Sequence, residues 1–260
     1  GPPKTDSGVS QKIQNQKAIW EKQGHLVKLF YLDPTPDKKN NLIDKYIQFW
    51  KNIQHTKRPL RNYHPDIIYA RHLRYAPGIK FLLKNAPTIF EVNSNDTRET
   101  WLRGNLKGIY NVITRGLVLK LAKGLIFVTK ELQDSKHFSK FKKKSRVISN
   151  GIELQRNYAE AQKYEVPTCV FIGTPGKPWH GMEKILFLAE NFPKIHFRII
   201  GLTKKQLSSI NLNYNKNKNV YAYGYLSKEK SNEIISKCHV GIGALEHKKK
   251  NMNEACSLKV

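Results

Sequence analysis

The chain has 260 residues, enough for one large domain or two of ordinary size, and its hydrophobic and aromatic shares of 39% and 10% exclude a largely disordered protein. The formal net charge of +26 predicts attraction to a polyanion, whether nucleic acid, an anionic bilayer or a phosphorylated substrate. Cys169, Cys238 and Cys256 are far apart and lack metal-binding spacing. We therefore expect free thiols in a reducing compartment, the cytoplasm. No signal peptide is visible, and no apolar run reaches the ~18 residues of a membrane span.

Short apolar runs alternate with amphipathic segments through the first half of the chain. Helices are predicted at residues 7–23, 41–53, 76–84, 98–123 and 129–138. Strands are predicted at residues 26–32, 66–70, 88–92, 125–128 and 145–148. The polar loop 93–97 follows one of these strands at its carboxyl end, where open α/β sheets bind their ligands.

The same alternation continues in the second half. Strands are predicted at residues 168–172, 196–200, 220–223 and 240–244, and helices at 181–190, 203–210 and 228–237. The Lys- and Asn-rich stretch 211–219 is predicted to be a surface loop. Strict alternation of strand and helix is typical of parallel, doubly wound sheets. We therefore predict two Rossmann-like α/β domains, 1–152 and 168–260, joined by a linker at 153–167.

The segment 168–183 carries the clearest binding signal. A buried strand breaks into a loop rich in Gly and Pro, and a helix begins directly after it. Such a loop presents bare backbone N–H groups and the positive end of a helix dipole to whatever binds there. The pattern predicts a phosphate-rich ligand in a cleft between the domains.

Three parts of the sequence, in this order, carry a family resemblance. The first is Ser-Arg-Val-Ile-Ser-Asn-Gly-Ile at 145–152, and the second is Val-Phe-Ile-Gly-Thr-Pro-Gly-Lys-Pro-Trp-His-Gly-Met at 170–182. The third comprises residues 219–224, 238–243 and 253–260. Together they resemble family 4 retaining glycosyltransferases of bacterial polysaccharide and glycolipid biosynthesis. The segment 6–10, followed by Gly24 and His25, is similar to the opening of that family's acceptor side. The resemblance implies the GT-B fold, in which two Rossmann-like domains face each other across a cleft.

The resemblance also implies a chemistry. A nucleotide-sugar, a UDP- or GDP-sugar, is held mainly by the second domain, and a saccharide or lipid-linked acceptor by the first. A hexosyl group is transferred with retention at the anomeric carbon. Positive groups stabilise the departing diphosphate, which is electrostatic and positional catalysis that needs neither a metal nor a cofactor.

The family's motifs assign roles to positions of this chain. The implied catalytic residues are Glu254, His180 and Lys177. The implied donor-binding residues are Gly8, Gly173, Thr174, Gly224, Tyr225, Leu226, Ala255, Cys256, Ser257, Leu258 and Lys259. The implied acceptor-binding residues are Glu91, Asn93 and Asp96.

Two features of the motifs leave alternatives open. In one register, Glu254 matches the first carboxylate of the family's Glu-x7-Glu motif, and the second carboxylate would fall at position 262, beyond this chain. In the other register, Glu246 and Glu254 are the two carboxylates, because they have the same spacing. We prefer the first register, because residues 258–260 match the residues after the first carboxylate in related enzymes. The family usually has Arg and Lys where this chain has Thr174 and His180, and Lys177 is the candidate replacement cation.

The ends of the sequence indicate a fragment. The chain begins Gly-Pro-Pro rather than with Met, no strand precedes the first predicted helix, and the last residues break off inside a predicted helix. We therefore expect a fold truncated at both ends, and a poorly active one, because half of the Glu-x7-Glu motif is absent.

Other interpretations compete with the enzyme. The segment 101–123 interleaves aliphatic and basic residues, which fits a face resting on anionic lipid but equally a core helix with one solvated side. A peripheral position on the inner membrane face would follow from the first interpretation. Nucleic acid is not an expected partner, because no binding signature occurs and the basic residues are scattered. A non-catalytic relative acting as a partner-binding module is the remaining alternative, and the departures at Thr174 and His180 favour it.

Overall fold

The computed structural model describes residues 8–32, 42–102, 104–151, 161–211, 214 and 217–254. These residues form two compact units: the first holds the described residues up to Gly151 together with Glu254, and the second holds those from 161 to Asn253. Most of the predicted linker, 153–167, lies outside the described residues. No helix in the described ranges combines the length and apolarity that a membrane span requires.

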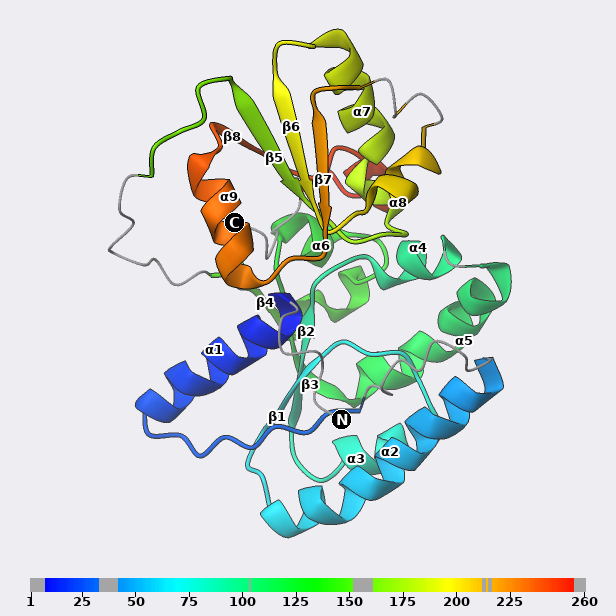
Figure 1. The fold of residues 1–260 in the computed structure, drawn as a ribbon. Coiled ribbons are helices and arrows are strands. Elements are labelled where there is room, and N and C mark those ends of the chain that lie inside the picture. Colours follow the sequence, from blue (N-terminus) through cyan, green and yellow to red (C-terminus); the bar gives the residue numbers. More distant parts are fainter. Residues whose placement is uncertain are drawn as a thin grey trace. The chain divides into compact units, whose positions relative to one another are not determined.

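The first unit is built on a four-stranded sheet in which every strand runs parallel to its neighbours (Figure 1). The strands are β1 (Ile68–Arg71), β2 (Thr88–Val92), β3 (Ala122–Phe127) and β4 (Ser145–Val147), in the order β1-β2-β3-β4. Central β2 is buried along almost its whole length, as expected for a parallel sheet covered on both faces. Helix α1 (Gly8–Lys22) lies on one side of this sheet, whereas α2 (Leu42–Tyr63) and α3 (Ile79–Leu83) lie on the other (Figure 1).

The remaining helices of the first unit follow β2 and β3. They are α4 (Asp96–Trp101), α5 (Asn105–Leu121), α6 (Lys130–Asp134) and the 3-10 helix η1 (Ser139–Lys144). Phe90, Phe127 and Phe138 are fully buried, and the rings of Phe127 and Phe138 meet edge to face with centroids 5.0 Å apart. These aromatic side chains anchor the core between the sheet and η1.

The second unit holds another parallel sheet, in the order β7-β6-β5-β8. Its elements are β5 (Thr168–Ile172), η2 (Pro178–His180), α7 (Met182–Asn191), β6 (His196–Ile200), α8 (Lys204–Ser208), β7 (Val220–Gly224), α9 (Lys228–Lys237), β8 (Val240–Ile242) and η4 (His247–Lys250). From β5 the chain proceeds outward through β6 to β7 and then returns to place β8 on the other side of β5. That reversal creates a topological switch point beside β5.

Alternating side chains of β5 and β6 feed two cores on opposite faces of this sheet. Phe171 and Ile199 pack on one face with residues of α7 and α8, whereas Val170 and Ile200 pack on the other with residues of α9. The helices accordingly lie on both sides of the sheet (Figure 1). The predicted class, two Rossmann-like parallel α/β sheets, is confirmed.

Side-chain caps explain where several helices begin. The hydroxyl of Thr129 accepts from the N–H of Leu132 at the start of α6, as the sequence predicts. Thr203 and Gln206 form a reciprocal capping box on α8, and Asn95 caps α4. Because Asn95 starts a helix, the predicted polar loop 93–97 is shorter than expected.

One predicted strand is wrong. Residues 26–32 form extended chain that pairs with no strand in the described ranges, and the side chain of Leu26 is 92% exposed. The segment is held by side chains of α2, since Tyr63 donates its hydroxyl to the carbonyl of Leu26 and Asn52 donates to that of Leu32. An apolar run becomes a strand only when a neighbour offers a hydrogen-bonded ladder.

The single helical region predicted at 98–123 is also wrong in detail. It divides into α4 and α5, and β3 already begins at Ala122. Gly104, between the helices, has φ +131°, a conformation that favours glycine. Trp101 then packs so closely on Gly108 that a Cβ there would lie 2.4 Å from the indole. Gly108 therefore lets the end of α4 lie against α5.

Candidate active site

The loops after β5 and β8 meet at the switch point of the second unit. The N–H of Leu245 donates to the carbonyl of His180, and the N–H of Glu246 donates to that of Trp179, both at 3.2 Å. In parallel α/β sheets, the crevice beyond the carboxyl ends of strands at such a reversal is where ligands bind. The predicted Gly/Pro loop is therefore located at the edge where sheets of this kind bind their ligands.

Three glycines join the strand ends at this edge. The N–H of Gly173 donates to the carbonyl of Ile200 at 2.9 Å, and Gly201 donates to the carbonyl of Gly224 at 2.5 Å. A Cβ on Gly201, which has φ +96°, would lie 1.8 Å from the carbonyl oxygen of Gly173. Gly173 and Gly224, both predicted donor-binding residues, are thus brought together through Gly201. No role was predicted for Gly201 from sequence, although its place at the end of a predicted strand was a usable signal.

The indole of Trp179 lies close to two cations. The ammonium of Lys177 is 5.1 Å from a ring centroid of Trp179, and that of Lys250 is 4.5 Å away. His180 is buried, and its ring meets Phe171 edge to face at 5.5 Å. Lys177 and His180 therefore belong to the switch-point loops, and their catalytic assignment stays a prediction.

Glu246 is held by lysines of the same region. Lys184 forms an ion pair with its carboxylate, and Lys249 approaches the other oxygen at 3.8 Å. The hydrogen bond from Lys184, together with the nearby positive charge, lowers the pKa of Glu246. A pocket of about 300 Å³ opens beside this pair, lined by Lys184, Ala244, Leu245, Glu246, His247, Lys248, Met252 and Asn253.

The other predicted donor residues divide into described and undescribed positions. Thr174 and Tyr225 are exposed, and Leu226 packs partly against the core on the α9 side. Ala255, Cys256, Ser257, Leu258 and Lys259 lie outside the described residues. Gly8 is the first residue of α1 in the first unit, and Glu254 also groups with that unit. The N–H of Glu254 donates to Glu131 Oε2 at 2.6 Å. The roles of these residues stay predictions.

The first unit gathers polar side chains around the carboxylate of Glu91, at the carboxyl end of β2. Lys12 Nζ lies 2.7 Å from Glu91 Oε1, and Asn93 Nδ2 lies 2.6 Å from the same oxygen. The hydroxyl of Tyr69 donates to Glu91 Oε2 at 2.6 Å, and Gln16 approaches it at 3.5 Å. We name these five side chains the Glu91 cluster: Lys12, Gln16, Tyr69, Glu91 and Asn93. They come from α1, from β1, from β2 and from the segment directly after β2.

These contacts fix the charge of the cluster. Burial by itself would raise the pKa of Glu91, but the hydrogen bonds from Lys12, Tyr69 and Asn93 and the charge of Lys12 outweigh burial and lower it. Burial and the carboxylate raise the pKa of Tyr69 beyond its usual range. Glu91 is therefore ionised at neutral pH, and Tyr69 is a hydroxyl donor.

Asp96 lies at the centre of a second hydrogen-bond network. Its two oxygens accept from Arg115 at 2.8 and 3.0 Å, and Asn111 donates to it at 2.8 Å. Burial alone would raise the pKa of Asp96, yet Arg115, His72 and Asn111 lower it. These contacts fasten α4 to α5, so the carboxylate has a structural task whether or not it also meets an acceptor.

Several buried polar atoms around the two networks lack a hydrogen-bond partner among the residues that the structure describes. These atoms are Arg71 Nη1, His72 Nε2, Asn93 Oδ1, Thr97 Oγ1 and Asn111 Oδ1. Burial lowers the pKa of His72, with Asp96 opposing and Arg115 adding to the effect. Buried polar atoms are normally satisfied, so such a concentration is typical of a place that receives water or a ligand. None of Lys12, Gln16, Tyr69, Arg71 and His72 was predicted from sequence, since nothing in the local pattern links α1 and β1 to Glu91.

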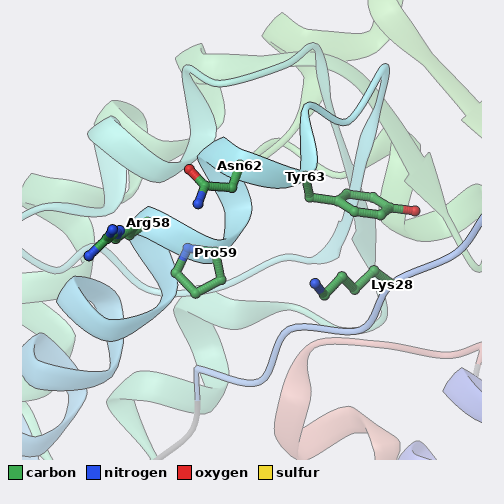
Figure 2. Close-up of a pocket in the computed structure, with 5 residues that line it drawn as sticks. All are labelled: Lys28, Arg58, Pro59, Asn62 and Tyr63. Atoms are coloured by element: carbon green, nitrogen blue, oxygen red, sulfur yellow. The ribbon is translucent and has the colours of Figure 1, made fainter.

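A further pocket of about 400 Å³ lies where α2 passes the segment 26–32. It is lined by Lys28, Arg58, Pro59, Asn62 and Tyr63 (Figure 2). The ammonium of Lys28 lies 5.4 Å from the ring centroid of Tyr63. Within the part of the chain that the structure describes, no group of three or more His, Cys, Asp or Glu side chains could hold a metal ion.

The two parallel sheets, with a switch point in the second, define an α/β protein of the GT-B kind. A family model for Glycosyltransferase Family 4 matches residues 7–156, more than half of the sequence. The chain belongs to glycosyltransferase family 4. No match was found among curated proteins.

Solved structures share the fold at low identity. Sucrose-phosphate synthase from Thermosynechococcus elongatus superposes with a TM-score of 0.57 and 13% identity, covering 80% of this chain and 56% of that protein. The Anabaena protein HepE, solved in complex with UDP and glucose, gives a TM-score of 0.52 and 13% identity over 87% of this chain and 63% of that protein. This chain therefore spans 56% and 63% of the lengths of the two proteins.

Proposed function

We propose that the protein is a retaining glycosyltransferase that moves a sugar from a nucleotide-sugar donor to a saccharide or lipid-linked acceptor in cell-surface polysaccharide synthesis. Membership of glycosyltransferase family 4 supports the transferase class. The observation that carries the donor side is the switch point, where the loop after β5 is hydrogen-bonded to the loop after β8. A UDP- or GDP-sugar is the proposed donor, and HepE has been solved with UDP and glucose.

The proposed donor site uses backbone amides and lysines. Gly173 itself serves packing, because the ring of Phe171 fills the position of its Cβ and its N–H donates to the carbonyl of Ile200. The backbone N–H groups proposed to meet the phosphate are those of the loop that follows Gly173. Lys177 supplies positive charge in the same loop. Groups of this kind favour the negative charge that develops on the departing diphosphate.

The proposed acceptor site is the Glu91 cluster. An ionised carboxylate accepts hydrogen bonds from sugar hydroxyls, and the partnerless atoms of Arg71 and Asn93 offer a donor and an acceptor beside it. In the proposed transfer, the bond between the anomeric carbon and the phosphate oxygen breaks, and an acceptor oxygen bonds to that carbon on the same face. The acceptor proton passes to the leaving diphosphate, so no metal or cofactor takes part.

Titration calorimetry with UDP-, GDP- and ADP-sugars tests the donor assignment. We expect heat and a raised melting temperature with one nucleotide class, because a ligand that binds only the folded protein stabilises it. A variant with Lys177→Gln should bind that donor more weakly, whereas Lys204→Gln on α8 is the matched control. Absence of heat with every sugar nucleotide would contradict the proposal and favour the non-catalytic relative.

The substitution Glu254→Ala tests the proposed catalytic carboxylate. We expect loss of sugar transfer with an unchanged melting temperature, because Glu254 is exposed and its hydrogen bond to Glu131 uses the backbone N–H. Glu246→Ala is the comparison, since it tests the other register of the Glu-x7-Glu motif. Near-normal transfer by the Glu254 variant would contradict the assignment.

A further inference from the structure

Helix α5 exposes most of its apolar side chains, although Val118 and Leu119 near its C-terminal end are buried. The side chains that it buries include Asn111, together with the half-buried Arg115, which grips Asp96. The exposed stripe consists of Leu106, Ile109, Val112, Ile113 and Leu117. Leu106 is 84% exposed and Ile113 is 71% exposed. A solvated helix normally shows the reverse pattern, with its apolar stripe toward the core.

The stripe belongs to a wider surface. Helix α3 contacts both α2 and α5, so the three helices form a continuous layer over one side of the first sheet. Phe81 on α3 is 62% exposed, and Ile47 and Trp50 on α2 are also exposed. Exposed apolar side chains gathered on neighbouring helices in this way mark an interaction site. We name the outward side chains of α2, α3 and α5 the α2–α3–α5 surface.

The charge of this surface is mostly positive. The three helices contain one acidic residue, Asp44 near the start of α2, and α3 and α5 contain none. The basic residues of these helices outside the Asp96 network include Lys51, Lys57, Arg58, Arg61, Lys80, Lys107 and Lys120. The ammonium of Lys57 lies 5.2 Å from the ring centroid of Phe81, so cation and exposed ring are direct neighbours.

We propose that the α2–α3–α5 surface docks on an anionic lipid bilayer. Aliphatic and aromatic side chains would enter the boundary between headgroups and acyl chains, and the lysines would meet lipid phosphates. The predominantly positive charge favours anionic lipid over a second copy of this chain, which would bring the same charges to the contact. Aliphatic side chains do not stack on bases, which disfavours nucleic acid. This docking rests on the proposed function and deepens it, because it brings the acceptor-binding unit to the membrane where a lipid-linked acceptor resides.

Vesicle flotation tests the docking. The protein is mixed with vesicles of equal parts phosphatidylglycerol and phosphatidylcholine, or of phosphatidylcholine alone. We expect the protein to float with the anionic vesicles and to be released by salt, which screens surface charge. Leu106→Gln with Ile113→Gln should weaken binding about tenfold or more, because two exposed aliphatic side chains no longer enter the bilayer. Lys107→Gln with Lys120→Gln should weaken it for anionic vesicles only.

Matched controls lie in the second unit. Phe187→Gln on α7 removes an apolar side chain that is 62% exposed, and Lys204→Gln with Lys205→Gln removes two exposed charges from α8. Neither should change flotation. Failure of the parent protein to bind anionic vesicles would overturn the docking, as would equal loss in the controls or a concentration-dependent dimer that the α5 variant abolishes. Sugar-nucleotide calorimetry on the same variants separates this failure from failure of the proposed function, because donor binding should stay unchanged.

Discussion

The buried charge of Glu91 makes the first unit sensitive to acid. Its folded pKa lies below the ordinary value of 4.5, so ionised Glu91 contributes stability above that value, and the contribution disappears as the pH falls toward the folded pKa. We expect Glu91→Gln to lower the free energy of unfolding at pH 7 by about 1–3 kcal/mol, because Lys12 and Tyr69 lose a charged acceptor. The deficit should shrink below pH 4.5.

Denaturant titrations of the parent and the variant across this pH range measure the effect. Asp66→Asn serves as the control, because Asp66 is exposed and its loss should change stability little. A Glu91→Gln deficit that is the same at acidic and neutral pH would show that packing, rather than charge, holds the cluster.

The close approach of Gly201 to Gly173 predicts a sharp substitution effect. Gly201→Ala places a methyl group against the carbonyl of Gly173 and forces φ +96° on a residue with a Cβ. We expect a loss of more than about 1 kcal/mol in unfolding free energy. Gly241→Ala is the matched control, because its added Cβ would meet nothing within 4 Å. Thermal unfolding distinguishes the two variants, and equal melting temperatures would contradict the prediction.

Single residues were predictable from sequence where a local pattern carries the information. Thr129 was recognised as a helix cap, and Gly173 and Gly224 were recognised as strand ends, because each follows an apolar run. Lys12 and Tyr69 were not, because their proximity to Glu91 arises only when α1 and β1 come together. Sequence spacing contains no signal for contacts made across distant elements.

At the scale of elements, Asn219 joins three parts of the second unit. Its amide donates to the carbonyls of Ala189, Phe192 and Ile195, at the end of α7 and just before β6. We expect Asn219→Ala to lower the unfolding free energy by about 1–3 kcal/mol, because buried carbonyls lose their donor. Asn191→Ala is the control, since that exposed amide donates to the carbonyl of Phe187 within its own helix. Equal effects in denaturant unfolding would refute the role of Asn219.

Strands of the second unit were predictable almost to the residue. Thr168–Ile172 and His196–Ile200 have the expected bounds, because a buried parallel strand is a short, continuous apolar run ended by glycine. Residues 211–219 were predicted to be a surface loop, yet Asn219 is buried. Its polarity alone could not indicate that its side chain donates to three backbone carbonyls. Segment 26–32 has the composition of a strand but no partner in the described ranges. Whether a segment becomes a strand depends on a neighbouring strand to pair with, which its own sequence does not show.

For the whole molecule, the net charge of +26 predicts a salt effect. Like charges repel one another in the compact state, and added ions screen that repulsion. We expect the melting temperature to rise as sodium chloride increases from about 10 mM to about 150 mM. An uncharged solute at matched osmolality controls for solvent effects. A melting temperature that falls with salt would mean that ion pairs such as Lys12–Glu91 outweigh the repulsion.

The extended segment 26–32 has a consequence for contacts between molecules. Its sequence, Leu-Val-Lys-Leu-Phe-Tyr-Leu, is rich in β-forming side chains, contains no proline and carries a single charge, Lys28. A chain of this composition without a ladder partner can act as a template for the same segment of another molecule. Lys28 would then act as a gatekeeper residue, so that neutralising it should promote fibrillar association rather than change the fold.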